Sequence, residues 1–393
     1  MVKKMKRIKI FSTFTLLLII LSFIPSLTLA VPSCYNWKDI TTNVSGPKPP
    51  ADGYMPVYDS ESDVIIFSYP ATKTIYAFNA TSNTFTSLSC PTMPDQVWNG
   101  YWQQYDEKND VVILFGGYLP DDPNGIGLDE TWSYDYNTNI WTNMNPPVSP
   151  PARTIGYMSF DSNAGKMLLF GGVARWSSPW IFYNDVWAYD YVLNNWTNVT
   201  PSVGPYPEAR FGHYWSFDPI LNKTLLFGGS TDTKLPNWNI IDDMWVYDLG
   251  SKTWTAINPN PKPSKRVYTN MIYDSNASKT LLYGGASRTP GYYMDYLADL
   301  WIFDSQTLTW FKTDCDRKPS ARMITGLVFQ SKLNKSFLYG AWNDPFNLDD
   351  FWSLTYDENC DCWIIPEFSE ILLFATIPLV SILAIVLYRK KKK

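Results

Sequence analysis

Short apolar runs recur along the chain at a nearly constant interval, and most of them end in two glycines. The run VVILFGG at 111–117 returns as KMLLFGG at 166–172, KTLLFGG at 223–229 and KTLLYGG at 279–285, with a weaker copy at 335–341. Successive copies are 55, 57, 56 and 56 residues apart. Runs of this length that are rich in β-branched and aromatic residues and end at Gly are typical of buried strands. The pattern predicts a repeated all-β unit.

A second pattern follows the first four of these apolar runs. Two tryptophans stand nine residues apart, as in Trp132 and Trp141, and an acid precedes the first of them by two positions. With its flanking turns, each unit reads as four short strands. The first tryptophans are Trp132, Trp187, Trp245, Trp301 and Trp352; the acids are Glu130, Asp185, Asp243, Asp299 and Asp350.

Together these motifs resemble the kelch repeat. The resemblance covers about residues 34–365 and implies an all-β, six-bladed kelch-type β-propeller, in which the tryptophans pack between blades. The blade units are expected at about 46–88, 89–144, 145–199, 200–257, 258–313 and 314–365. The repeat glycines that permit sharp strand exits are Gly116, Gly117, Gly171, Gly172, Gly228, Gly229, Gly284 and Gly285.

The sixth unit lacks a cleanly spaced fourth strand, because DENCDC at 357–362 interrupts it. The segment 35–40, upstream of the first unit, resembles a fourth strand around Trp37. We expect it to close the last blade, although 362–365 is a rival for the same place.

Five cysteines follow the predicted leader, an odd number, so at least one is free or intermolecular. Cys34 begins the closing strand, and Cys360 and Cys362 lie in the turn that it faces. We expect a disulfide from Cys34 to Cys360 or Cys362, with Cys90 and Cys315 unpaired.

Both ends of the chain carry targeting signals. Residues 1–30 have a basic start, an apolar run at 11–24 and Thr28-Leu29-Ala30, which predicts a signal peptide, with an uncleaved anchor as the alternative. Residues 371–388 are 18 uncharged residues followed by the basic tail 389–393, which predicts one transmembrane helix with the tail in the cytoplasm and the propeller outside. The junction Pro366-Glu367-Phe368 resembles the PEF-type anchors of archaeal surface proteins, which implies processing by a sortase-like enzyme; a plain membrane anchor is the alternative.

Charge and composition narrow the chemistry. The formal charge is 32 − 37 = −5, but ten cations lie in the two terminal segments, so the body carries 22 − 37 = −15. A body this acidic repels nucleic acid. The single histidine, His213, disfavours a His-ligated metal, and the copper chemistry of galactose oxidase, a kelch enzyme, needs two. We expect no catalytic residue, metal or cofactor, and a packed, hydrogen-bonded core role for His213.

The second-to-third strand connections are long, at 118–129, 173–184, 230–242, 286–298 and 342–349, which suggests that their face binds a partner. Four arginines open the first strands on that face, and each either pairs with the acid before the first tryptophan or contributes to an anion clamp, as other kelch propellers use. The candidate ligand-binding residues are Arg153, Arg210, Arg266, Arg322, Tyr118, Trp176, Trp180, Trp238, Tyr293 and Trp342.

Seven glycosylation sequons fall mainly at turns of the opposite face and on an outer strand: Asn43, Asn79, Asn195, Asn198, Asn222, Asn276 and Asn334, of which only Asn43 touches the long-loop face. The sequence thus predicts a single-pass cell-surface propeller that binds an extracellular protein or glycan. An extracellular carbohydrate-active enzyme is the alternative, and the oligomeric state stays open.

Overall fold

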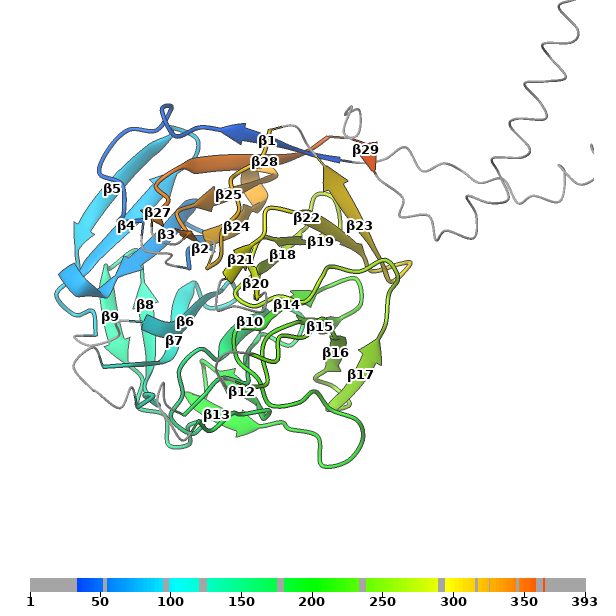
Figure 1. The fold of residues 1–393 in the computed structure, drawn as a ribbon. Helices are drawn as coiled ribbons and strands as arrows, with labels where there is room; N and C mark the ends of the chain where they lie inside the picture. The colour runs from blue at the N-terminus through cyan, green and yellow to red at the C-terminus, as the bar shows by residue number, and fades with distance from the viewer. Residues whose placement is uncertain are drawn as a thin grey trace, which may run out of the picture.

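The computed structural model describes residues 34–51, 55–94, 99–119, 126–174, 180–232, 238–288, 294–314, 317–324, 326–343, 346–357 and 363–364. Six antiparallel sheets stand around a common axis (Figure 1). The predicted six-bladed, all-β propeller is confirmed.

Each blade is built from at least four strands with the first strand nearest the axis, and in blades one to five these four follow in sequence order. The first blade contains β2 (Val57–Asp59), β3 (Val64–Tyr69), β4 (Thr74–Asn79) and β5 (Thr84–Ser89). The second contains β6 (Asn99–Asp106), β7 (Val111–Tyr118), β8 (Thr131–Asp135) and β9 (Ile140–Asn143). The third contains β10 (Tyr157–Asp161), β11 (Lys166–Phe170), β12 (Val186–Asp190) and β13 (Asn195–Asn198).

The remaining blades follow the same plan with additions. The fourth contains β14 (Tyr214–Asp218), β15 (Lys223–Phe227), β16 (Met244–Asp248) and β17 (Thr253–Ile257). The fifth contains β18 (Asn270–Asp274), β19 (Lys279–Tyr283), β22 (Leu300–Asp304) and β23 (Thr309–Asp314), and the sixth contains β24 (Gly326–Gln330), β25 (Lys335–Tyr339) and β28 (Phe351–Asp357). Two hairpins, β20 (Ala286–Arg288) with β21 (Met294–Tyr296) and β26 (Trp342–Asn343) with β27 (Phe346–Asn347), and two 3-10 turns, η1 (Pro70–Thr72) and η2 (Ser331–Leu333), complete the described elements.

The first described strand closes the ring. β1 (Cys34–Asp39) pairs antiparallel with β28, and Trp37 lies opposite Leu354. This is the fourth-strand role that we expected for 35–40. The rival segment instead gives β29 (Trp363–Ile364), which pairs with β23 as a fifth strand of the fifth blade. β1, β28 and β29 therefore lie together at one edge of the ring (Figure 1).

In five of the blades, one aromatic residue on the outer strand packs on a ring of the preceding blade. Trp196 lies 5.2 Å from Phe115, Trp254 lies 5.1 Å from Phe170, and Trp310 lies 6.0 Å from Phe227, measured between ring centroids. Trp37 repeats this contact against Tyr283 at 5.0 Å, and Phe85 packs on Tyr339 at 5.9 Å. The second tryptophan of each pair is thus a core residue, as predicted, whereas Trp132, Trp245 and Trp352, the first of their units, are only half-buried.

Several predictions concern residues outside the described part of the chain. These are the leader 1–30, the helix 371–388, the tail 389–393, and Cys315, Cys360 and Cys362. Among the described residues, no helix has the length and apolarity required to cross a bilayer. Cys90 is buried and carries a free thiol, as predicted.

The closing strand offers a direct stability test. Trp37 is buried against the fifth blade, whereas its neighbour Lys38 is exposed. Trp37→Ala should lower the free energy of unfolding by about 3–5 kcal/mol through lost packing, whereas Lys38→Ala should change it by about 0.5 kcal/mol or less. Denaturant unfolding measures both, and equally small effects would show that β1 does not close the ring.

Candidate functional site

The two ends of the propeller differ in construction. At one end, the aspartate that closes the first strand of blades one to five accepts backbone N–H bonds from the two residues that form the turn, as Asp218 does from Ile220 and Leu221 at 3.0 and 3.1 Å. These turns are short and saturated with hydrogen bonds. The long connections emerge at the other end, where the β20–β21 hairpin lies close to the centre of the ring (Figure 1). The aspartates are Asp59, Asp106, Asp161, Asp218 and Asp274.

An arginine anchors the start of the first strand in blades three to six. Arg266 shows the arrangement: Nη1 and Nη2 donate to the two carboxylate oxygens of Asp299 at 2.8 and 2.9 Å, and Nη1 also donates to the carbonyl of Gly284 at 2.9 Å. Trp301 Nε1 donates to the same carboxylate at 2.7 Å. Every donor of the guanidinium fork therefore meets an acceptor within its own blade. The other pairs are Arg153–Asp185, Arg210–Asp243 and Arg322–Asp350.

These contacts decide between the two roles considered for the arginines. All four side chains are at most 1% exposed. Burial by itself would raise the pKa of Asp185, Asp299 and Asp350, but the hydrogen bonds and charges of their arginines outweigh it and hold each pKa below its usual range. The four arginines thus follow the pairing alternative, which removes them from the candidate ligand surface.

The arginine backbone also joins consecutive blades. Gly229 N–H donates to the carbonyl of Arg266 at 2.9 Å, and Gly117, Gly172 and Gly285 repeat this bond to the next arginine along the chain. At these glycines a side chain would clash with neighbouring backbone. Gly228 has φ +67°, and a Cβ there would lie 2.7 Å from the Arg266 carbonyl oxygen. The glycine pairs are therefore places where one blade touches the next.

The aromatic residues of the long loops pack against one another and against Phe211. Trp180 stacks near Phe182 at 6.3 Å between centroids, Phe182 lies 5.9 Å from Phe211, and Trp238 meets Phe211 edge-on at 5.3 Å. Phe211 is fully buried, whereas Trp180, Phe182 and Trp238 are half-buried. The loops thus form a packed layer in which the aromatic side chains remain partly exposed to solvent.

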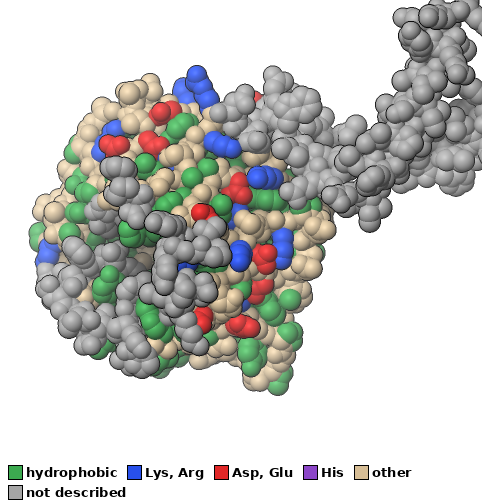
Figure 2. Space-filling model, viewed as in Figure 1, with side chains coloured by type: hydrophobic (Ala, Val, Ile, Leu, Met, Phe, Trp, Pro, Cys, Tyr) green, Lys and Arg blue, Asp and Glu red, His purple; other side chains and the backbone are tan. Residues whose placement is uncertain are grey.

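The other predicted loop residues lie around this layer. Trp342 on β26 is 45% exposed, and Tyr118 at the end of β7 is half-buried. Trp176 and Tyr293 lie outside the described residues. Arg288, which the sequence analysis did not single out, holds its guanidinium carbon 5.1 Å above the Trp238 ring, and its Nε and Nη1 make no hydrogen bond within the described residues. In the view of Figure 2, apolar, acidic and basic side chains are interspersed without a large field of one charge.

Two protein-family descriptions match this repeat geometry. The description "Attractin/LZTR1 beta-propeller" matches residues 66–276, more than half of the chain, and "KLHDC2/KLHL20/DRC7 Kelch-repeats domain" matches residues 194–370. The chain belongs to the Attractin/LZTR1 family of kelch-type β-propellers.

Curated relatives support the same family. Host cell factor 1 of Homo sapiens is 28% identical over 272 residues, which cover 64% of this chain and 12% of the relative. Host cell factor 2 of Homo sapiens is 27% identical over 255 residues, which cover 59% of this chain and 29% of the relative. The dynein alpha chain of the flagellar outer arm of Chlamydomonas reinhardtii is 23% identical over 60% of this chain and 5% of its own length. The kelch propeller thus corresponds to a small part of each relative.

The single histidine of the kelch propeller is buried completely. His213 packs 5.0 Å from Tyr157 and 5.1 Å from Phe170, between centroids. Its ring nitrogens make no hydrogen bond of normal geometry among the described residues, so the predicted core position is confirmed but the hydrogen-bonded role is not. Burial, and then the charge of Arg210, hold the pKa of His213 well below its usual value.

The sequons occupy turns and outer strands. Asn222, Asn276 and Asn334 lie in exposed turns between the first and second strands of their blades. Asn79 ends β4, while Asn195 and Asn198 begin and end the outer strand β13. Asn43 follows β1 and is exposed. Two sequons therefore lie toward the long-loop face: Asn43 in the connection to the first blade, and Asn198, which pairs with Trp187 near the start of β12.

The arginine pairs should dominate stability. Arg266→Met leaves Asp299 without its partner and should lower the free energy of unfolding by about 3–5 kcal/mol. Arg317→Met removes an exposed arginine and should cost about 0.5 kcal/mol or less. Adding Asp299→Leu to Arg266→Met should recover part of the loss. Strict additivity in this double-mutant cycle, measured by denaturant unfolding, would contradict a coupled pair.

His213 should make the propeller acid-sensitive. A histidine that stays neutral when folded but takes up a proton when unfolded lowers stability by about 1.4 kcal/mol for each pH unit below about 6.5. Burial raises the pKa of Asp106, Asp161 and Asp274, which increases stability as the pH falls. These aspartates are present in the wild type and in the His213→Gln variant alike, so their effect cancels when the two are compared. The wild type should therefore lose more stability than His213→Gln between pH 7 and 5. Parallel curves of unfolding free energy against pH would refute this role.

Proposed function

We propose that this chain is a binding propeller whose long-loop face receives a protein partner. The observation that carries the proposal is the half-buried aromatic layer at this face, with Trp342 beside it at 45% exposure. Large aromatic side chains supply most of the binding energy at protein interfaces, and rigid neighbours reduce the entropy lost on binding. The kinship with host cell factors, in which the kelch propeller forms part of a much longer chain, agrees with a module for interactions.

The opposite face is less suited to this task. Its turns are closed by buried aspartates that already accept two backbone N–H bonds each, and three exposed sequons lie among them. A glycan at Asn222 or Asn276 would hold a large partner away from this surface. The difference between the faces therefore favours the long loops as the binding surface.

We further propose that the propeller is displayed outside the cell, exported by residues 1–30 and anchored by residues 371–388. Support comes from the leader pattern and from the apolar run followed by basic residues. Proteinase K added to intact cells should then remove the propeller. Full protection until the cells are lysed would contradict this location.

A photo-crosslinking experiment on the full-length chain in its native host tests the face. A benzophenone amino acid at position 342 should crosslink to a discrete protein, whereas the same group at position 222 should not. A crosslink only from position 222, or a product at position 342 whose added mass is removed completely by glycosidase, would overturn the protein-binding face.

The partner found in this way then allows a test of individual residues. Trp180→Ala with Trp238→Ala should weaken its affinity about 30-fold or more, as expected for interface anchors. The matched control, Asn222→Gln with Asn276→Gln, should leave affinity unchanged. An unfolding curve for each variant separates lost binding from lost structure.

A further inference from the structure

Three blades share an ion pair between the start of the second strand and the end of the third. Lys166 pairs with Asp190, Lys223 with Asp248 at 2.8 Å, and Lys279 with Asp304 at 3.0 Å. In each pair the lysine begins the second strand and the aspartate ends the third, directly across the sheet. One carboxylate oxygen accepts turn N–H bonds, while the other accepts the lysine ammonium.

The second blade keeps the aspartate but not the lysine. Val111 begins β7 and lies across the sheet from Asp135, since the neighbouring residues Val112 and Tyr134 are paired. Asp135 Oδ1 accepts the turn N–H groups of Asn137 and Thr138 at 2.8 and 3.3 Å, as in the sister blades. Among the described residues, no ion pair reaches Asp135 Oδ2, which is the oxygen that takes the lysine elsewhere.

The other two blades do not share this imbalance. The first blade places Val64 and Asn79 at these positions, so neither residue is charged. The sixth places Lys335 opposite Thr355, so it has the lysine without the acid. Only the second blade therefore combines the carboxylate with an apolar residue in the lysine position.

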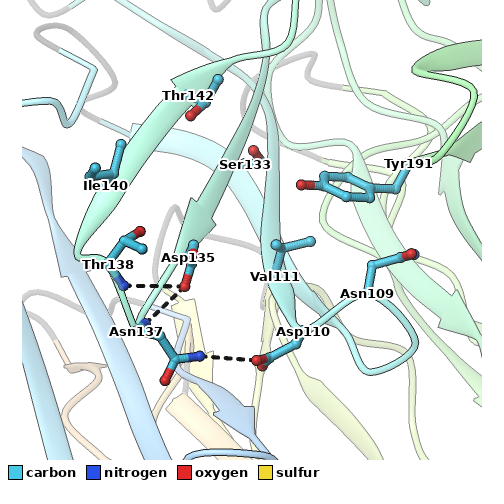
Figure 3. Close-up of a pocket in the computed structure, with 10 residues that line it drawn as sticks. All are labelled: Asn109, Asp110, Val111, Ser133, Asp135, Asn137, Thr138, Ile140, Thr142 and Tyr191. Carbon is cyan, nitrogen blue, oxygen red and sulfur yellow. Dashed lines mark hydrogen bonds between the residues drawn. The ribbon is translucent and has the colours of Figure 1, made fainter.

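A groove of about 400 Å³ lies where that lysine would run. Figure 3 shows Val111 in its middle, with Asp135 and Thr142 along one side and the Tyr191 ring reaching in from the third blade. Asp110 stands at the end of the groove, where its carboxylate accepts hydrogen bonds from Asn137 at 3.1 Å and Tyr105 at 2.8 Å. The groove thus offers two carboxylates, several hydroxyls and one aromatic ring.

The local charge favours a cation. Burial raises the pKa of Asp110, and the neighbouring carboxylates Asp59, Glu61 and Asp135 raise it further. In the sister blades, by contrast, the lysines hold the pKa of Asp190 and Asp248 below the usual range. A cation in the groove would relieve the repulsion that the missing lysine leaves.

We propose that this groove, lined by Val111, Asp135, Asp110 and Tyr191, binds the ammonium group of a lysine side chain from a partner polypeptide. The ammonium would take the place on Asp135 Oδ2 that Lys223 and Lys279 take in their own blades. The alkyl stem would run along Val111, and the Tyr191 ring lies where it can face the cation. This site is separate from the long-loop face and does not depend on the function proposed for it.

A small probe tests the site on the intact chain. Nα-acetyl-lysine N-methylamide is titrated while NMR follows the methyl group of Ile140, which lines the groove. A saturable shift with a dissociation constant on the order of millimolar is expected, because one partly exposed ion pair contributes little. The norleucine analogue, which lacks the ammonium, should give no saturable shift.

Three variants sharpen the test. Val111→Lys supplies the missing lysine and should abolish the shift while preserving or raising the melting temperature. Asp135→Asn removes the charge without filling the groove. It should weaken binding about 5-fold or more. Lys166→Val removes the lysine from Asp190 and should create a similar site in the third blade, detected at the Leu193 methyl group. Binding there should be weaker, because the neighbouring fourth blade offers Leu249 in place of the aromatic ring that Tyr191 supplies to the second-blade groove.

The outcomes decide the proposal. Saturation by the lysine probe that is lost in Val111→Lys and weakened in Asp135→Asn supports it. Equal shifts from the norleucine analogue would show a merely apolar groove. Saturation by Ca²⁺ but not by the lysine probe would show a divalent-cation site instead. No saturable shift from any probe would also overturn the proposal.

Discussion

The buried arginine–aspartate pair is the interaction on which the rest of this propeller depends. In each of four blades it ties the start of the first strand to the start of the third, while its tryptophan partner holds the carboxylate from the other side. The same arginine accepts a backbone N–H from the glycine pair of the preceding blade. One residue therefore closes its own sheet and joins it to the preceding one. Such a pair is costly to break, because the charge that remains stays buried.

This arrangement separates stability from recognition. The arginines, repeat glycines and outer aromatics join the blades, while the long loops contribute backbone bonds to the arginines, such as Arg266 N–H to the Ile241 carbonyl. They hold their aromatic side chains as a half-buried layer on a rigid base, which is the arrangement that lowers the entropy cost of binding. Positions that depart from the repeat are therefore candidates for functional residues. Arg288 over Trp238 at the loop face and Val111 opposite Asp135 in the second blade are two of them.

The sequence predicts the ring well because the same motifs recur once in nearly every blade. The glycine pairs and the nine-residue tryptophan spacing give the blades, and the likeness of the Trp37 segment to a fourth strand gives the closure. The pairing of β29 with the fifth blade could not be foreseen, because two residues, Trp363 and Ile364, carry no periodic signal. The recurring acid favours pairing for the arginines, but sequence alone does not exclude an anion clamp, because the paired geometry depends on the folded blade. The imbalance at Asp135 is visible in the sequence as VVILFGG beside KMLLFGG. Its meaning required the strand register, which places Val111 and Asp135 face to face.

Hydrogen–deuterium exchange tests the central claim that the blades are joined into one cooperative ring through the glycine–arginine contacts. The N–H groups of Gly117, Gly172, Gly229 and Gly285 should exchange only through global unfolding, with one shared free energy, and Arg266→Met should lower that value at all four positions together. If only Gly229, which bonds to Arg266, and Gly285 of the same blade as Arg266 lost protection while Gly117 and Gly172 kept theirs, the blades would be independent units and the arginine pairs would be local features.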